Sequence, residues 1–470
     1  MTTRKLVLEA ILRQSLAAFI EKAFQVVSPS DLFLPNWHIN VIADHLEQCY
    51  YGNIKRLIIT MPPRSMKSIC ASVAFPCWVL GQDPSRRIIC ASYAADLALK
   101  FSRDCKAVMG SNWYREGFPG TRLERSAEHD LITTMKGGRY ATSVGGTLTG
   151  RGGNIIIIDD SMKPQEGLSE ASRNATKQWY DGTLYSRLDS KADDVIILVM
   201  QRLHVDDLVA HVTGKEEWVH LNLPAIATHD QSFILSDGRQ FSRHTGDVLH
   251  PERESLRVHE NIRSNIGSFN FEAQYQQQPV PVEGNLIKWS WFSTYETLPT
   301  REDTDQVIQS WDTATKVHEL SDYSVCTTWL IKGNDYYLID VYREKLDYPA
   351  LKPVVVSNAE KFRPDSILIE DTASGSALLQ DYHNHQLRGI PRPIPITPKG
   401  DKVVRMSAQS AKIEAGQVHL PRKAPWLDEF KKEFLAFPNG NHDDQVDSLS
   451  QFLNWFNNRH VSGVVKLTGL

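Results

Sequence analysis

The stretch Asn154-Ile155-Ile156-Ile157-Ile158-Asp159-Asp160 decides the fold of the first half of this chain. Four consecutive isoleucines predict a strand that is buried on both faces, as strands are in a parallel sheet covered by helices. The two carboxylates follow at the carboxyl end of that strand. There Asp159 can hold a metal ion through water, and Asp160 can orient or deprotonate an attacking water. A turn at the strand end, a frequent use of aspartate, is the simpler alternative.

A second segment, residues 60–68, lies upstream between a predicted strand and a predicted helix. A helix N-terminus offers free amides and the positive end of a dipole, so this segment is a candidate phosphate-binding loop. Lys67 would reach the β- and γ-phosphates of ATP, and the Ser68 hydroxyl would bind Mg²⁺. Met66 stands where glycine is usual, so an ordinary lysine at a helix start remains an alternative. We expect the nucleotide to contact Arg64, Ser65, Met66, Lys67 and Ser68. With the acidic strand in this order, the loop predicts an ATP-hydrolysing site.

Strand-like and helix-like segments alternate around these two motifs. The expected strands are 56–60, 87–92, 155–158 and 195–200, and the expected helices are 68–78, disturbed by Pro76, and 96–109. Alternation of this kind favours a parallel sheet covered by helices. The fold class is therefore α/β, with an N-terminal P-loop nucleoside-triphosphatase domain of the ASCE type.

The pattern loosens into proline, glycine and polar residues between about 223 and 300, and the domain junction is expected there. Three strand-like segments in a row (306–311, 323–331 and 336–341) and then alternating helix and strand follow. This order fits a ribonuclease H-like domain with a mixed sheet. A chain of 470 residues is long enough for two or three domains. We expect a first domain over 1–240, a linker over 241–300, a second domain over 301–460 and a tail over 461–470.

Four carboxylates mark the second domain. Asp312 and Glu370 each end a predicted strand, and Asp444 and Asp447 open a late helix at a spacing that puts both on one face. Two-metal cleavage of a phosphodiester needs three or four carboxylates that converge from different elements. We therefore expect Asp312, Glu370 and Asp444 to be catalytic and to bind Mg²⁺ or Mn²⁺ together with Asp443 and Asp447.

The choice between Asp443 and Asp444 as the primary ligand stays open. Asp322 and Asp371 are possible auxiliary ligands, and His442 could assist proton transfer. Taken singly, each carboxylate is as compatible with a cap or a turn.

Composition neither supports nor excludes nucleic acid as a partner, because the net charge is −4. Any DNA contact must come from local basic patches, and the candidates are residues 399–405 and 421–423. No apolar run approaches the roughly 20 residues needed to cross a bilayer, so no membrane segment is expected.

Further motifs surround these sites and carry a resemblance to a known family. They are Trp37-His38, Pro62-Pro63-Arg64 with Lys67-Ser68, Ser92-Tyr93 with Leu97-Ala98, Gly150-Arg151-Gly152-Gly153, Gln201-Arg202-Leu203-His204, and the junction string Phe271-Glu272-Ala273-Gln274-Tyr275. With them the chain resembles the large terminase subunit of tailed bacteriophages, from about residue 32 to residue 456.

The resemblance implies roles for several residues. Arg64 would sense or stabilise the γ-phosphate, and Trp37 and His38 would lie in the segment that contacts adenine. Residues 199–202, which include Gln201 and Arg202, would couple hydrolysis to movement. Arg151 is a candidate arginine finger for a neighbouring subunit, or else a loop arginine that faces solvent.

The resemblance also implies an ATP-driven motor that packages double-stranded DNA into a procapsid and a metal-dependent endonuclease that cuts concatemeric DNA. The implied partners are double-stranded DNA, a portal protein, a small terminase subunit and copies of the chain in a ring, with a monomer in solution. The implied location is the host cell cytoplasm. A helicase-nuclease or resolvase in DNA repair or recombination is the alternative enzyme. A scaffold or DNA-binding remnant is disfavoured, because no lysine or carboxylate of the two sites is missing.

Overall fold

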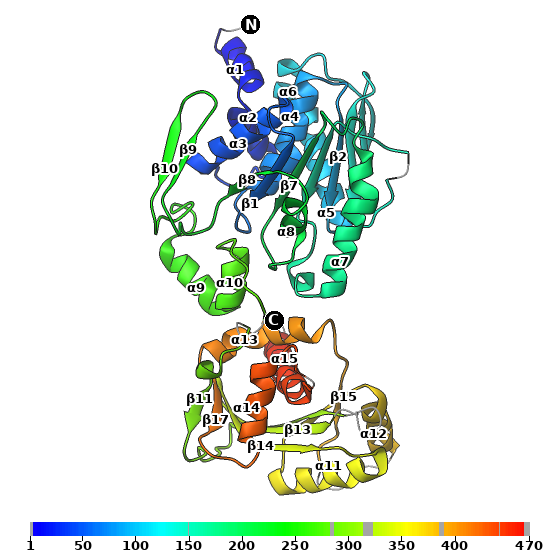
Figure 1. Cartoon of the computed structure of the whole chain (residues 1–470), viewed down its shortest axis with the longest axis vertical. Coiled ribbons are helices and arrows are strands. Elements are labelled where there is room, and N and C mark those ends of the chain that lie inside the picture. The colour runs from blue at the N-terminus through cyan, green and yellow to red at the C-terminus, as the bar shows by residue number, and fades with distance from the viewer. Residues whose placement is uncertain are drawn as a thin grey trace, which may run out of the picture. The chain divides into compact units, whose positions relative to one another are not determined.

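The computed structural model divides the chain into two compact units. The first unit comprises Met1–Ile262 and Asn270–Val280, and the second comprises Arg263–Phe269 and Pro281–Leu470. The structure describes residues 3–148, 150–282, 286–313, 323–384, 390–440 and 442–464. Figure 1 shows the elements of both units. Across these described ranges, no helix combines the length and the apolar composition that a membrane span requires.

The first unit contains an eight-stranded sheet in the order β3-β4-β5-β2-β6-β7-β1-β8. The strands from β5 to β8 in this order are parallel, whereas β3 and β4 form an antiparallel edge. Their bounds are β1 (Arg56–Thr60), β2 (Arg87–Ser92), β3 (Leu123–Ala127), β4 (Asp130–Thr133), β5 (Gly138–Ser143), β6 (Ile155–Asp159), β7 (Val195–Met200) and β8 (Val219–Asn222). The four predicted strands are confirmed. The antiparallel edge was not predicted, because β3 is exposed and lacks an apolar pattern.

Helices cover both faces of this sheet, and the strands alternate their side chains between two hydrophobic clusters. Leu57 and Ile59 of β1 join the cluster under α2, α3, α4 and α5, whereas Ile58 joins the cluster under α7 and α8. The helices are α1 (Thr3–Gln14), α2 (Leu16–Val27), α3 (Trp37–Tyr50), α4 (Phe75–Gln82), α5 (Ala95–Gly110), α6 (Asn112–Gly117), α7 (Glu170–Trp179) and α8 (Leu208–Thr213). A strand buried on both faces must be apolar throughout, which is why the isoleucine run of β6 was readable in the sequence.

The two motifs of the sequence meet because β7 alone separates their strands. Ile58 of β1 pairs with Leu198 of β7, which pairs on its other side with Ile158 of β6. All three strands are parallel, so the residues after Thr60 and those around Asp159 lie at one edge of the sheet. The parallel, ASCE-type arrangement predicted from the sequence is confirmed.

The helix after the loop departs from α geometry at its start. Residues Ile69–Ala74 are π-helical, and α4 follows with Pro76 near its N-terminus. Proline has no amide hydrogen, so it cannot donate to the carbonyl of Ser72 one turn earlier. That carbonyl accepts instead from Nη2 of Arg139 at 3.3 Å. The disturbance expected at Pro76 is thus a change of helix type.

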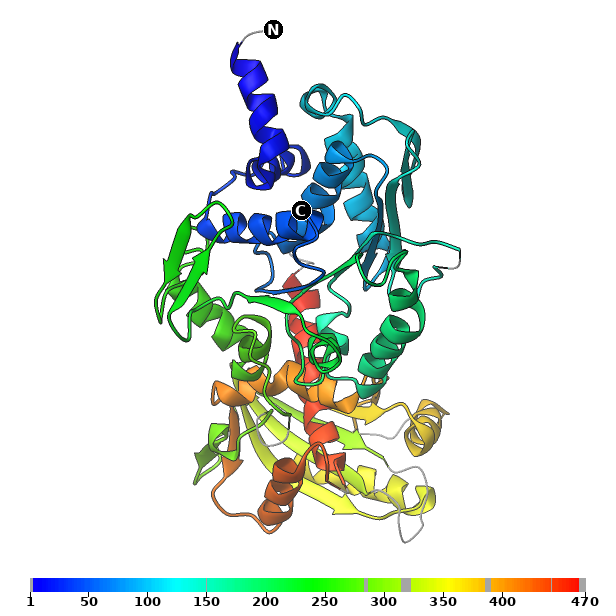
Figure 2. The same cartoon turned by 45° about the horizontal axis from the view of Figure 1, so that its top comes forward.

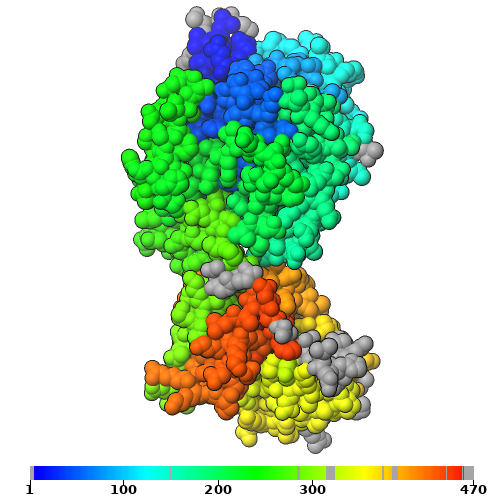
Figure 3. Space-filling model, in the orientation of Figure 1, coloured from blue at the N-terminus to red at the C-terminus, as the bar shows by residue number. Residues whose placement is uncertain are grey.

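A polar hairpin, β9 (Gln231–Ile234) and β10 (Gln240–Arg243), follows the sheet and was not predicted. Trp37 at the start of α3 stacks on Phe233 of this hairpin, with ring centroids 5.3 Å apart. Figure 3 shows the N-terminal helices (blue) and the hairpin segment (green) side by side on the surface of the first unit. Two helices come next in the chain, α9 (Leu256–Ile266) and α10 (Ser268–Gln274).

The second unit contains a seven-stranded mixed sheet in the order β11-β17-β14-β13-β12-β15-β16. Strands β12, β13 and β14 pair antiparallel, and β15 joins β12 in parallel. The bounds are β11 (Ser293–Tyr295), β12 (Gln306–Asp312), β13 (Ser324–Lys332), β14 (Asp335–Glu344), β15 (Ser366–Glu370), β16 (Ile394–Ile396) and β17 (Val418–Pro421). The predicted ribonuclease H-like order, three strands and then alternating helix and strand, is confirmed.

Helices lie on both faces of this second sheet. Trp311 of β12 packs in one cluster with Leu351 of α11 and Leu378 of α12. Trp329 of β13 stacks on Phe452 of α15, with ring centroids 4.8 Å apart. Figure 2 shows α15 (red) crossing the strands of this sheet. The helices are α11 (Tyr348–Phe362), α12 (Ala373–Asn384), α13 (Lys402–Glu414), α14 (Leu427–Ala436) and α15 (Asp444–Val464).

Candidate nucleotide and nuclease sites

The predicted phosphate loop lies against the end of the acidic strand. Lys67 is 6% exposed, and its ammonium group lies 3.3 Å from Oδ2 of Asp160. Asp160 also accepts a hydrogen bond from the amide of Gln201, at 3.3 Å from its Oδ1. The second carboxylate of the motif therefore links the loop to the end of β7.

The first carboxylate, Asp159, is held by two hydroxyl groups. Ser68 donates to its Oδ1 at 3.0 Å, and Ser72 donates to its Oδ2 at 2.6 Å. Burial and the neighbouring Asp160 raise the pKa of Asp159 to about 6. A divalent cation bound nearby would favour the charged form of this carboxylate.

The loop takes a backbone conformation that usually requires glycine. Arg64 has φ of 60° and Met66 has φ of 71°, both in the left-handed region, and Asp160 across the site has φ of 48°. A non-glycine residue in this region costs on the order of 1 kcal/mol or more. The loop lacks the glycines that would adopt this conformation freely, so its backbone is locally strained. Such strain is typical of binding loops that the surrounding structure holds in place.

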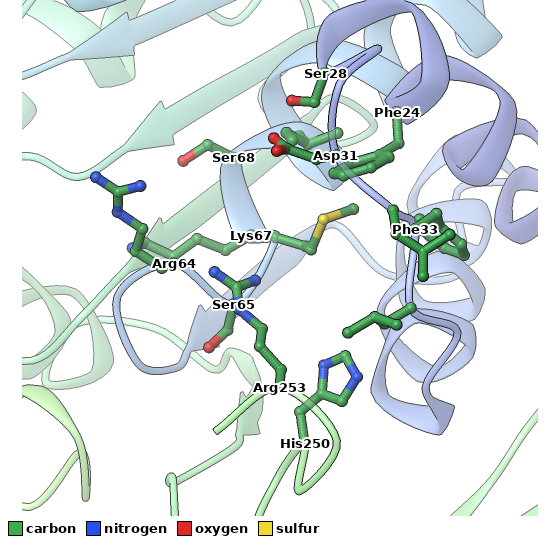
Figure 4. A pocket seen from close by; sticks show the side chains of 14 residues that line it. Phe24, Ser28, Asp31, Phe33, Arg64, Ser65, Lys67, Ser68, His250 and Arg253 are labelled. Atoms are coloured by element: carbon green, nitrogen blue, oxygen red, sulfur yellow. The ribbon is translucent and has the colours of Figure 1, made fainter. Parts of the chain in front are cut away.

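A cavity of about 550 Å³ opens over this loop, and Figure 4 shows the side chains that line it. One part of its lining is the loop from Arg64 to Ile69. Another part is apolar and aromatic and includes Phe24 and Phe33, whose ring centroids are 5.4 Å apart. The remaining lining residues are Ser28, Asp31, Leu32, Leu34, His250 and Arg253. The cavity therefore joins a cationic loop to an apolar surface, as a nucleoside phosphate requires.

Trp37 and His38, expected beside adenine, do not line this cavity. The Trp37 ring stacks on the hairpin, and His38 is fully buried behind the loop, where its Nδ1 lies 2.5 Å from Nδ2 of Asn36. Burial lowers the pKa of His38 to about 3, and the nearby imidazole of His250 contributes to the shift. His38 is therefore a neutral histidine packed in the interior, away from the lining of the cavity.

The predicted coupling residues follow β7. Gln201 is 6% exposed, and its side-chain oxygen is buried without a hydrogen-bond partner among the described residues. Arg202 donates from Nε to Asp207 at 2.7 Å, and its amide donates to Oε1 of Gln277 at 2.9 Å. Gln201 is thus fixed by its backbone to Asp160, while Arg202 is fixed to the residues after it.

Arg151 lies far from the loop along the sheet, beside the antiparallel edge. Its two terminal nitrogens bond both oxygens of Asp130, at 3.3 and 3.2 Å, and its guanidinium lies over the ring of Tyr140 at 3.9 Å. Within its own chain Arg151 is an engaged side chain and does not approach the cavity over the loop.

The second unit brings its predicted carboxylates to one end of its sheet. Strands β12 and β15 pair in parallel with Trp311 opposite Ile369, so the following residues, Asp312 and Glu370, lie side by side. Desolvation raises the pKa of Asp312 well above its usual range, and the charges of Glu370, Asp447 and Asp444 raise it further. Four carboxylates from three elements therefore share one electrostatic environment.

Two cations of α13 face this acidic group. Arg405 donates from Nη2 to Asp447 at 2.7 Å, and Lys402 forms an ion pair with Asp443. Desolvation raises the pKa of Glu370 and of Asp447, and in both cases Arg405 opposes the shift. Searched over the part of the chain that the structure describes, no three His, Cys, Asp or Glu side chains form a ready-made metal-binding group. Arg405 and Lys402 therefore neutralise part of the negative charge of the carboxylates, which a divalent cation would also neutralise.

The other residues predicted for the nuclease site are His442, Asp371, Asp443 and Asp322. His442 lies 4.0 Å from Asp444, and Asp371 accepts a hydrogen bond from Ser376 at 2.7 Å. Asp443 pairs with Lys402, whereas Asp444 is among the charges that raise the pKa of Asp312. Asp322 lies outside the described residues.

Several residues around the two sites escaped the sequence analysis. Ser72 and Arg253 sit in segments without a motif, and only the fold brings them to the loop. Thr372 donates to Oε1 of Glu370 at 3.2 Å, and a Cβ at Gly375 would lie 2.0 Å from the Glu370 carbonyl oxygen. Arg405 could have been found from the sequence, because it belongs to the basic patch 399–405, which the sequence analysis assigned to DNA contact.

Comparison with protein families decides the class of the second unit. Residues 309–456 match the family model of the terminase RNaseH-like domain. This part of the chain therefore resembles a terminase RNaseH-like domain. Its match spans all four carboxylates, from Asp312 to Asp447.

One solved structure extends the likeness of fold beyond residues 309–456. A large terminase from a thermophilic bacteriophage, solved in complex with ADP, is 13% identical with a TM-score of 0.50, covering 92% of this chain and 98% of that chain. The HK97 bacteriophage large terminase is 11% identical with a TM-score of 0.35, covering 87% of this chain and 90% of that chain. The large terminase nuclease of the thermophilic phage G20c with bound zinc is 17% identical with a TM-score of 0.27, covering 34% of this chain and 92% of that chain.

At these identities the likeness is one of fold. A comparison with the curated proteins gave no match. The resemblance to large terminase subunits drawn from the sequence is confirmed.

Proposed function

We propose that this chain is the large subunit of a viral DNA-packaging motor, which hydrolyses ATP to move double-stranded DNA into a procapsid and cuts the DNA with its terminase RNaseH-like domain. One observation carries the proposal. A P-loop-like cavity and a carboxylate group of nuclease type occur on one chain, and the second lies within a terminase RNaseH-like domain. The ADP complex of the thermophilic bacteriophage large terminase supports nucleotide binding by this fold.

In the first unit, Lys67 and Ser68 would contact the phosphates and the metal ion, with Arg64, Ser65 and Met66 around them. Asp159, which bonds Ser68, would hold Mg²⁺, and Asp160, which pairs with Lys67, would orient water. The base would lie on the apolar side of the cavity, against Phe24 and Phe33, rather than on Trp37 or His38. The amide of Gln201 bonds Asp160. Gln201 would therefore be the first residue outside the site to respond to ATP hydrolysis.

In the second unit, Asp312, Glu370, Asp444 and Asp447 would hold Mg²⁺ or Mn²⁺. The donor set fits such ions, because it consists of hard carboxylate oxygens whose charged forms repel one another until a cation is present. When bound, the ions would activate water and stabilise the charge that develops on the cleaved phosphate. Asp443, paired with Lys402, is the weaker candidate of the neighbouring pair.

Partners follow from the same proposal: a portal protein, a small terminase subunit and copies of this chain in a ring, in the cytoplasm of the host. Arg151 would reach a neighbouring subunit only after leaving Asp130. A helicase-nuclease remains the competing function, and the match to a terminase RNaseH-like domain disfavours it.

Two variants measured side by side test the proposal. Lys67→Ala should abolish ATP hydrolysis and leave metal-dependent cutting of plasmid DNA intact, whereas Asp312→Ala should do the reverse. Excess EDTA should end cutting by every form of the protein. Equal ATPase rates for Lys67→Ala and the parent would remove the motor assignment, and unchanged plasmid cutting by Asp312→Ala would remove the nuclease assignment.

A further inference from the structure

A turn far from the phosphate loop in sequence lines the same cavity. His250 and Arg253 line the same 550 Å³ cavity as Lys67 and Ser68, although more than 180 residues of chain separate the two segments. Figure 4 shows the Arg253 side chain extending beside Ser65, on a different side of the loop from Arg64. The cavity is therefore lined by cations from two separate segments of the chain.

The backbone of this turn is held in place by bonds to the body of the unit. The amide of Leu249 donates to the carbonyl of Ala225 at 2.7 Å, and its carbonyl accepts from Nδ2 of Asn36 at 2.6 Å. The carbonyl of His250 accepts from the amides of Arg253 and Glu254, at 3.1 and 3.0 Å. The backbone that carries Arg253 is therefore fixed, so the side chain starts from a defined position beside the phosphate loop.

The polar groups that this turn presents have no partner of their own. Arg253 is an exposed side chain, and within the described residues its guanidinium makes no ion pair and no side-chain hydrogen bond. His250 is 9% exposed, and its Nε2 is buried without a hydrogen-bond partner. This nitrogen is closed to solvent, and the imidazole packs against His38 with ring centroids 5.5 Å apart, so it is the Arg253 guanidinium and not this nitrogen that is open to a ligand.

We infer that Arg253 is a phosphate-binding residue of the nucleotide site, reaching the polyphosphate from a segment of the chain other than the loop that carries Lys67. The inference rests on the proposed function, because it takes the occupant of the cavity to be a nucleoside triphosphate. A guanidinium matches phosphate in charge and in its planar pair of donors, and charge-assisted bonds of this kind are the strong ones.

Calorimetric titration of ATPγS, ADP and inorganic tripolyphosphate, each with Mg²⁺, tests the inference. Arg253→Ala should weaken tripolyphosphate and at least one of the two nucleotides by about tenfold or more, as expected for the loss of one charge-assisted pair. Loss with ATPγS alone assigns Arg253 to the terminal phosphate, and loss with both nucleotides assigns it to an inner one. Arg253→Lys should bind these probes with intermediate affinity, because it keeps the positive charge and loses the planar pair of donors.

Arg257, an exposed arginine on α9 that does not line the cavity, provides the matched control. Arg257→Ala should bind all three probes like the parent, and Arg253→Ala should unfold at the parental temperature without nucleotide. If Lys67→Ala loses binding while Arg253→Ala keeps parental affinity for tripolyphosphate, the inference is overturned and the proposed function stands. If the parent binds no nucleotide, both fall.

Discussion

The ammonium group of Lys67 lies 3.3 Å from Asp160, whereas Asp159 is bonded by the hydroxyls of Ser68 and Ser72. The two carboxylates of one motif therefore have separate partners. The division follows from the backbone, because Asp159 ends β6 and Asp160 turns away from the strand with φ of 48°. A residue that holds metal and a residue that positions water need this difference in direction.

Asp160→Asn tests that division of roles. Removing the charge of Asp160 should leave the affinity for ATPγS unchanged or higher, since a negative group next to the phosphates is lost. The rate of ATP hydrolysis should fall by about 10²–10⁴-fold, the usual contribution of a positioned acid or base. Asp159→Asn is the comparison, and it should weaken Mg²⁺-dependent nucleotide binding. Parental hydrolysis by Asp160→Asn would assign the water-orienting role elsewhere.

Arg405→Ala tests whether this arginine balances the acidic group of the second unit. Without Arg405, the carboxylates of Asp447, Asp312 and Glu370 lose their neighbouring cation, so the free energy of unfolding in EDTA should fall by on the order of 2 kcal/mol. Mn²⁺ should then raise the unfolding temperature of the variant more than that of the parent. Arg422→Ala breaks an exposed pair with Glu296 and serves as the control. Identical Mn²⁺ shifts in variant and parent would contradict this account.

Gly375→Ala tests the support under Glu370. The added methyl group would lie 2.0 Å from the Glu370 carbonyl oxygen and 3.0 Å from Oγ1 of Thr313, so the end of β15 must move. Overpacking of this kind costs about 1–3 kcal/mol, and plasmid cutting should fall with it. Gly182→Ala is the control, because a Cβ there meets nothing within 4 Å. Parental stability and cutting in Gly375→Ala would show that the strand end is not fixed by this contact.

His38→Gln tests the buried histidine by its pH dependence. The pKa of His38 is lowered from 6.5 to about 3 in the folded chain, so below pH 6.5 only the unfolded chain takes up the proton readily. Stability should therefore fall as the pH decreases from 6.5 toward 3, by about 2 kcal/mol from this group at pH 5. Urea unfolding at pH 8 and pH 5 should show a smaller difference for His38→Gln than for the parent. His244→Gln, at an exposed position, should keep the parental difference.

The sequence predicted the central strands and their ends because strands buried on both faces must be continuously apolar. The strands ending at Asp159 and Glu370 follow this rule, whereas β12, which ends at Asp312, also buries Gln309 and Ser310. The edge strand β3 and the hairpin β9–β10 were missed, since exposed strands carry no such pattern. Local periodicity thus located the core of each sheet and not its edges.

The chain by itself determined which chemical groups stand at the ends of which strands, because strand ends and helix starts depend on neighbouring residues. Tertiary structure alone decided which groups meet. It paired Lys67 with Asp160, brought Ser72 to Asp159, carried Arg253 to the loop and placed Arg405 against Asp447. These contacts depend on how helices and turns distant in the chain pack on the sheets, and no spacing along the sequence encodes that packing.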